Sequence, residues 1–172
     1  WGAAETLGGF VATAALFGIF LLLQSRRRDP LMPLRIFRAP NLAAANVIML
    51  LLGAAWIPSW FFLNLYLQQV LGYGAFEGGA ALLPMTAMIM VLMVGASGRI
   101  VARAGFKRPL VAGLLVLAAG IGALSLGRAD GSFLIDVPPA TLIAATGMSL
   151  AYIPAMLAAL SGARPEEGGL AS

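Results

Sequence analysis

The chain has 172 residues, of which 60% are hydrophobic and only 10% are charged. A soluble domain carries about 25% charged residues, and a globule of this size leaves much of its surface in water. The sequence contains no Cys and no His, which excludes disulfides, Cys/His zinc sites and Ser-His triads, so we expect no metal site. The net charge of +4 fits a nucleic-acid ligand or a membrane, and the distribution of charge has to decide between them.

Five charge-free runs divide the sequence: residues 6–25, 39–76, 78–98, 109–127 and 137–163, with lengths of 20, 38, 21, 19 and 27 residues. About 20 apolar residues in a helix cross a bilayer core of about 30 Å. We therefore predict five transmembrane helices, at about residues 7–23, 43–70, 79–101, 109–127 and 138–160. The 38-residue run has no polar turn near its middle and is predicted to be one long helix. The predicted fold class is all-α, a polytopic transmembrane helix bundle; buried helices of a soluble protein and a membrane barrel fit less well.

The loops between these helices alternate in charge, which predicts their orientation. The side that holds residues 26–38, 99–108 and 164–167 carries ten basic and three acidic residues, and the other side carries one basic and four acidic residues. Basic residues stay in the cytoplasm, so we expect a multi-pass protein of the plasma (inner) membrane whose segment ends on the cytoplasmic side. The basic clusters are short and lie beside the spans, which favours contact with lipid headgroups over a nucleic-acid partner.

The helix predicted at 43–70 has a polar and aromatic face. At 100° per residue, the residues within about 120° of one another are Asn46, Gly53, Trp56, Trp60, Asn64 and Gln68. Amides that face lipid lose hydrogen bonds, so this face is expected to look into protein or a wet cavity. Tryptophan offers flat contact area for an apolar or cationic ligand. The alternative is that the amides bond to a neighbouring helix and the tryptophans are core or interface anchors.

The other helices carry weaker signals. On the helix at 138–160, Thr141, Met148, Tyr152 and Met156 share a face with Ser149 on its margin, where ordinary packing is the favoured alternative. Small residues predict close helix contacts at Gly113, Gly120, Ala123 and Gly127, and at the stretch from Gly95 to Gly98. Pro58, Pro84 and Pro154 are expected to bend their helices. No ionisable residue falls at mid-membrane depth, so this segment offers no proton relay.

Residues Gly98 to Arg108 resemble the cytoplasmic signature loop of the major facilitator superfamily, G-x-x-x-D-R-x-G-R-[KR]. Gly98, Arg103, Gly105 and Lys107 match this conformational loop, whereas Ala102 and Phe106 stand where the family has Asp and Arg. Further stretches are similar to blocks of the fourteen-helix drug/proton antiporter branch: residues 28–38, 66–72, 78–84 and 167–172. The degenerate loop is typical of the second half of such transporters.

The resemblance implies an organisation for the chain, which begins with Trp and is expected to be a piece of a longer protein. Residues 1–40 would be the end of a linker helix pair plus a basic cytoplasmic loop. Residues 41–172 would be the first four helices of the C-terminal six-helix half, whose partners are the lipid bilayer, the N-terminal half and the last two helices of the same protein. In that superfamily the first and fourth helices of each half line the substrate cavity, and here these are the helices at 43–70 and 138–160.

The resemblance also implies a function: a secondary-active multidrug exporter, not an enzyme, that moves small amphipathic or cationic drugs by alternating access. It would use a proton gradient and no cofactor. The residues expected to contact the small-molecule substrate are Trp56, Trp60, Asn64, Gln68, Met148 and Tyr152. Two alternatives stay open: a non-transporting scaffold or sensor of the same fold and, less favoured, a membrane-embedded enzyme.

Overall fold

The computed structural model describes residues 3–26, 30, 40–128 and 131–161. In this part of the chain, the helical segments that are long and apolar enough to cross a membrane are Ala4–Arg26, Leu42–Val70, Ala75–Ala104, Lys107–Leu124 and Phe133–Leu160. The five predicted crossings are therefore confirmed, with ends displaced by a few residues. The 38-residue charge-free run forms one crossing, as predicted, because nothing polar interrupts it.

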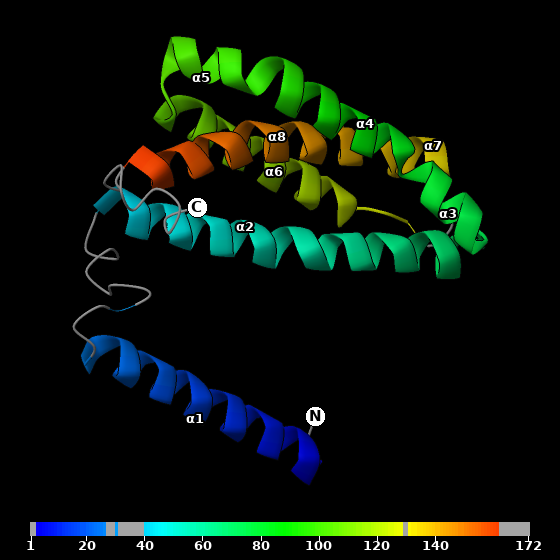
Figure 1. Ribbon diagram of the computed structural model, residues 1–172. Coiled ribbons are helices and arrows are strands. Elements are labelled where there is room, and N and C mark those ends of the chain that lie inside the picture. Colours follow the sequence, from blue (N-terminus) through cyan, green and yellow to red (C-terminus); the bar gives the residue numbers. More distant parts are fainter. Residues whose placement is uncertain (1–2, 27–29, 31–39, 129–130, 162–172) are drawn as a thin grey trace.

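Some of these crossings are built from several helical pieces (Figure 1). The first crossing is α1 (Ala4–Arg26), and the second is α2 (Pro40–Leu65), which continues as the π-helix η2 (Tyr66–Val70). The third is made of α3 (Ala75–Ala81), α4 (Leu83–Val91), the π-helix η3 (Leu92–Ser97) and α5 (Gly98–Ala104). The fourth is α6 (Lys107–Leu124), and the fifth joins the short α7 (Phe133–Asp136) to α8 (Pro138–Ser161).

The three prolines predicted to bend helices occupy two kinds of position. Pro58 and Pro154 lie inside α2 and α8, as predicted. Pro84 lies in the first turn of α4, just after a turn at Leu82. A proline is tolerated in a first turn because that N–H would have no partner in the helix. Pro84 therefore lies inside the third crossing, as predicted, and begins a new helical piece there because the α-helix is interrupted at Leu82.

Consecutive crossings run in opposite directions (Figure 1). The start of α2, the turn from α5 to α6 and the end of α8 lie at one end of the bundle. The turn from η2 to α3 and the turn from α6 to α7 lie at the other end. Arg103, Lys107 and Arg108 are exposed at the turn from α5 to α6, whereas most of the other two basic loops, at 26–38 and 164–167, lies outside the described residues.

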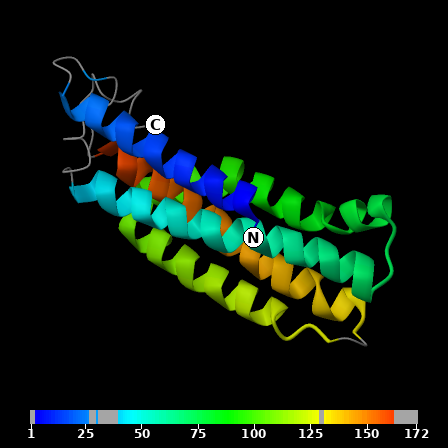
Figure 2. The same cartoon turned by 90° about the horizontal axis from the view of Figure 1, so that it is seen from below.

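Helix α8 is the central element, since it packs against α6, α2, α4 and η3 (Figure 2). Its contact with α6 uses backbone rather than large side chains. A Cβ added to Gly113 would lie 2.5 Å from the backbone nitrogen of Ala151, and Gly120 and Gly147 have similarly little room. The predicted close contact is thus confirmed at Gly113 and Gly120.

Two other small-residue predictions hold only in part for the described residues, since η3 does pack against α8 but through Ser97 and not through its glycines. Gly127 lies beyond the end of α6 and is exposed, because α6 ends at Leu124. Gly95 and Gly98 have no atom within 4 Å of an added Cβ, so neither glycine makes a close helix contact. The buried residue of that stretch is Ser97, which is 1% exposed.

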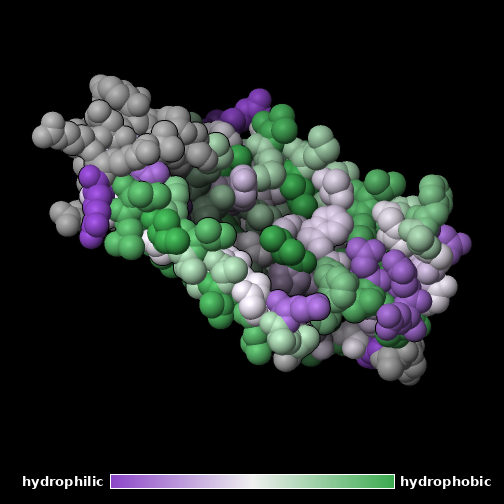
Figure 3. Space-filling view, turned by 60° about the horizontal axis from the view of Figure 1, so that its bottom comes forward, coloured by the Kyte–Doolittle hydropathy of each residue, from purple (hydrophilic) through white to green (hydrophobic). Residues whose placement is uncertain are grey.

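The surface of the helices is apolar over most of its length. Leu50, Ile57 and Val94 are 72%, 70% and 86% exposed, and hydrophobic residues dominate the view in Figure 3. Among the described residues, no buried side-chain nitrogen or oxygen is left without a hydrogen-bond partner. Exposed apolar side chains together with internally satisfied polar groups are what a lipid environment requires. Helix α1 stands apart from the other helices (Figure 1).

Candidate substrate-binding face

The two tryptophans of α2 form an aromatic pair that is only partly buried. The ring centroids of Trp56 and Trp60 are 6.3 Å apart and the ring planes make an angle of 78°. This edge-to-face arrangement is a favourable geometry for aromatic side chains. Residues four apart share a face of an α-helix, so the pair and the half-buried Asn64 present one continuous surface.

The predicted amides of α2 bond to their own helix. Asn46 Nδ2 donates to the carbonyl of Leu42 at 2.9 Å, and Asn64 Nδ2 donates to the carbonyl of Trp60 at 3.2 Å. Asn46 is exposed and Asn64 is half-buried. The interhelical bonds considered as an alternative are therefore not what holds these two side-chain nitrogens in the described part of the chain.

Gln68 belongs to η2 and not to the α-helical part of the crossing. A π-helix closes its hydrogen bonds between residues five apart, so the rotation per residue that placed Gln68 on the tryptophan face does not hold beyond Leu65. Gln68 is exposed, and its Cγ would lie 3.9 Å from a Cβ added to Gly78 of α3. The side chain therefore lies beside α3.

Helix α8 contributes to the same region through Met148. Met148 and Trp56 pack against one buried cluster that comprises Leu52, Leu110, Leu117, Ala144, Ala151 and Ala155. Tyr152 is half-buried one turn further along α8. Trp60 packs instead against a second cluster of Leu63, Leu67, Leu82 and Val137. The fold thus brings Trp56 and Met148 onto one cluster from two helices, while Trp60 packs against the second cluster.

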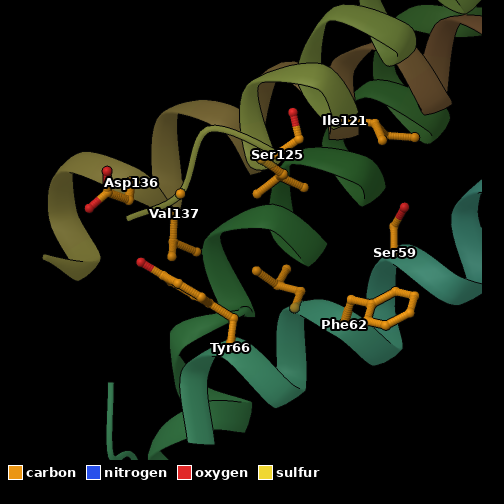
Figure 4. Close-up of a pocket in the computed structure, with 10 residues that line it drawn as sticks. Ser59, Phe62, Tyr66, Ile121, Ser125, Asp136 and Val137 are labelled. Carbon is orange, nitrogen blue, oxygen red and sulfur yellow. The ribbon is translucent and has the colours of Figure 1, made fainter. Parts of the chain in front are cut away.

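A pocket of about 350 Å³ lies on a different face of α2. Its lining residues are Ser59, Phe62, Leu63, Tyr66, Ile121, Leu124, Ser125, Gly127, Asp136 and Val137, and none of the six predicted contact residues is among them. Figure 4 shows Tyr66 extending from η2 toward Val137 and Asp136. No sequence pattern marks this pocket, because the rotation of α2 against α6 depends on tertiary packing. Between Trp56, Trp60, Met85 and Ala144 there is a space of only about 10 Å³, which holds no ligand.

Polar groups close one end of this pocket. The Tyr66 hydroxyl donates to the carbonyl of Arg128 at 2.9 Å, and the Arg128 Nε lies 3.5 Å from Asp136 Oδ1. The backbone N–H of Ser132 donates to Asp136 Oδ2 at 2.8 Å. These contacts fasten η2 to the connection between α6 and α7. An added Cβ at Gly131 would collide with the Asp136 carboxylate and the Tyr66 hydroxyl, so a larger residue there would have to displace these two side chains.

The conformational loop forms the turn between α5 and α6. Gly98 begins α5, and Gly105 ends it with a φ of 69°, a backbone conformation that glycine adopts without strain. The N–H of Gly105 donates to the carbonyl of Val101 at 2.9 Å. Arg103 and Lys107 are exposed on either side of this turn. The loop therefore presents positive charge at one end of the bundle.

Residues 24–157 match the MFS_1 like family. This match covers most of the chain and all four crossings from α2 to α8 almost completely. The chain belongs to the major facilitator superfamily.

Individual relatives of this superfamily agree with that assignment. The chain is 41% identical over 130 residues to the tetracenomycin C resistance and export protein of Streptomyces glaucescens, covering 76% of this chain and 24% of the relative. It is 30% identical over 177 residues to the cephamycin export protein CmcT of Amycolatopsis lactamdurans, covering 100% of this chain and 36% of the relative. It is 28% identical over 138 residues to the multidrug transporter protein MdtP of Bacillus subtilis, covering 78% and 25%.

The comparison fixes the class of this chain. It spans between about a quarter and just over a third of the length of these relatives. The relatives are named as export, resistance or transporter proteins and not as enzymes. The predicted fold class and superfamily are confirmed, and the alternative of a membrane-embedded enzyme is set aside.

Proposed function

We propose that this chain is part of a secondary-active exporter of small amphipathic or cationic molecules. The observation that carries the proposal is the partly exposed Trp56–Trp60 pair, of which Trp56 packs with Met148 of α8 against one buried cluster, in a family of export proteins. Aromatic faces and methionine bind varied apolar and cationic ligands by stacking and dispersion. Asn64 and Gln68 would add hydrogen bonds, and Tyr152 would add a further aromatic contact.

Alternating access would move this face between the two sides of the membrane. The exposed Arg103 and Lys107 would lie at the cytoplasmic side, since basic loops stay there. There they would contact lipid phosphates and stabilise one orientation. The organisation proposed for the whole protein keeps residues 1–40 as the end of a linker and 41–172 as the first four helices of a C-terminal half of six.

Proton coupling is proposed to use carboxylates outside residues 1–172. Within the described crossings, acidic and basic side chains lie at or near the helix ends, where Glu5, Glu77 and Asp136 are examples. A proton carrier would need an ionisable side chain at mid-membrane depth. An N-terminal half with such carboxylates would supply it.

The test uses the full-length protein and a set of fluorescent cationic dyes. Replacement of both Trp60→Ala and Asn64→Ala is expected to change the relative rates at which the dyes are exported, with the amount of protein in the membrane unchanged. Leu51→Ala is the control, because Leu51 is 62% exposed and off the tryptophan face. Phe62→Ala tests the separate pocket in the same assay.

Three outcomes would contradict this proposal. An unchanged dye profile in the double variant removes the tryptophan face of α2 from the binding site, and a changed profile in Phe62→Ala alone transfers the site to the pocket. Vesicles that contain the intact protein and export no dye under an imposed proton gradient would favour the non-transporting scaffold or sensor.

A further inference from the structure

The Ser97 hydroxyl makes a contact that neither the substrate face nor the signature loop accounts for. Ser97 is the last residue of η3, and its Oγ lies 3.0 Å from the carbonyl oxygens of both Leu92 and Ser149. Ser97 and Ser149 are 1% and 0% exposed. A hydroxyl has one proton and two carbonyls compete for it, so the contact has two alternative forms.

The two acceptors belong to different crossings. Leu92 is five residues before Ser97, which is the spacing of the π-helix itself. Ser149 is on α8, so the second acceptor joins the third crossing to the fifth. When the Ser97 hydroxyl donates to the carbonyl of Ser149, the hydrogen bond joins the third crossing to the fifth. When it donates to the carbonyl of Leu92, the hydrogen bond stays within η3.

The position of this contact links two regions of proposed functional importance. Ser97 directly precedes Gly98, where α5 and the conformational loop begin. Ser149 follows Met148 and is three residues before Tyr152, both of which are on the proposed substrate face. A change at Ser97 therefore acts on the loop on one side and on the substrate face on the other.

Both helices are weakened beside this contact. On the third crossing, Ser97 lies in the π-helix η3, where hydrogen bonds join residues five apart instead of four. Such segments are frequent at functional sites. On α8, Pro154 supplies no N–H, which deprives the carbonyl of Leu150 of its helical partner. Gly95 and Gly98, which flank Ser97, have no atom within 4 Å of an added Cβ, so the third crossing has room to turn there.

We propose that Ser97 is a positioning residue for transport, whose hydroxyl couples movement of the signature loop to α8. In one conformation the proton lies toward Ser149 and holds α5 against the substrate-bearing helix. In the other it lies toward Leu92 and α5 moves independently. This inference rests on the proposed transport function and adds a residue that acts without touching the substrate.

The experiment compares Ser97→Ala with Thr86→Val in the full-length protein, with ethidium as the probe. Ser97→Ala removes only the hydroxyl, and the expected result is a fall of about three- to tenfold in the maximal efflux rate, the size of one lost hydrogen bond. The KM for ethidium should stay within about twofold, since Ser97 does not bind it. Thr86→Val removes a half-buried hydroxyl of the same crossing that donates to Leu82 at 3.2 Å within its own helix, and it should export normally.

A second measurement follows hydrogen exchange of the backbone amides without any ligand. Ser97→Ala is expected to speed exchange in residues 92–98 and in residues 149–154 together, whereas Thr86→Val should leave both segments unchanged. If Ser97→Ala does not fold, the wild type is measured alone, and exchange in the two segments must respond together to ethidium. Exchange that changes in one segment only overturns the coupling.

The proposal is also overturned if Ser97→Ala and Thr86→Val export ethidium equally, or if Ser97→Ala raises KM without lowering the maximal rate. A wild type that exports no ethidium contradicts the proposed function instead. The ligand-free exchange experiment still decides whether Ser97 couples the two crossings in that case.

Discussion

Helix α8 meets its two main neighbours in contrasting ways. Against α6 the contact is made by Gly113, Gly120 and Gly147, which allow the two backbones to touch. Against α2 the contact is made through side chains, and Trp56 and Met148 of the proposed substrate face pack against one buried cluster there. Backbones in direct contact have one way to fit, whereas partly exposed aromatic and thioether side chains have several rotamers.

This difference indicates a division of tasks within the four-crossing bundle. The α6–α8 pair forms a stiff unit, because any change of register would bring a Cβ into a backbone. Helix α2 rests on that unit through a surface that can repack when a ligand enters. The contrast predicts that substitutions on the α6 side change stability and that substitutions on the α2 side change binding.

The largest expected effect is that of Gly120→Leu on stability. The added side chain would enter the backbone at Ala144, and since backbone cannot move aside we expect a loss of about 3 kcal/mol or more. The measurement is the thermal unfolding midpoint of the full-length protein in detergent, together with its yield from the membrane.

The matched control for this substitution is Gly122→Leu on the same helix. Gly122 is exposed and has no atom within 4 Å of an added Cβ, so the same change should cost little there. Equal losses in the two variants would show that helix propensity, and not contact with α8, decides the outcome.

Next in size is Trp56→Ala on the α2 side. Removal of a buried aromatic side chain costs about 3–5 kcal/mol, and for the half-buried Trp56 we expect about 2 kcal/mol. The sharper expectation is a loss of dye binding, measured by fluorescence titration, that exceeds the loss in Leu51→Ala. If Trp56→Ala lowers stability but leaves the affinity for the dye unchanged, the role of Trp56 is structural, as the role of α6 is expected to be.

The membrane-spanning helices were predictable from the sequence, because a helix in lipid requires a long run without charged residues and the sequence contains five such runs. The close contact of α6 at Gly113 and Gly120 was also predictable, because small residues at helical spacing in a membrane helix are typical of sites where two helices pack closely. Its partner Gly147 was missed, since it is a lone glycine within α8 and no pattern marks it.

The π-helices and the pocket could not be predicted from periodicity. Tyr66 begins η2 and Ser97 ends η3, and their hydroxyls bond to Arg128 and Ser149, which are 62 and 52 residues away in the sequence. The rotation of 100° per residue does not apply within η2, so periodicity alone does not predict the direction of Gln68. The six proposed contact residues remain a prediction, of which the structure brings Trp56 and Met148 onto one cluster.

A smaller effect is expected for Tyr66→Phe, which tests how α2 is held at its far end. The ring would stay in place, and the bond from its hydroxyl to Arg128 at 2.9 Å would be lost. One neutral hydrogen bond contributes about 1 kcal/mol, so the unfolding midpoint should fall slightly. Tyr73→Phe is the control, because Tyr73 contributes a ring contact with Phe133 at 5.8 Å. Equal shifts in both variants would contradict a role for the Tyr66 hydroxyl in fastening α2.

The smallest effect is expected for Arg128→Gln at the same end of the bundle. The Arg128 side chain is 59% exposed and its Nε lies 3.5 Å from Asp136, and such surface pairs contribute about 0.5 kcal/mol or less. Asp136 keeps its bond from the Ser132 N–H at 2.8 Å, so the carboxylate is not left alone. The midpoint should therefore shift less than in Tyr66→Phe, and added salt should erase the difference from the wild type. A larger or salt-independent fall in the unfolding midpoint would mean that the Arg128–Asp136 pair holds this end of the bundle together. Helix α2 would then be less able to move against α8 than its side-chain contacts indicate.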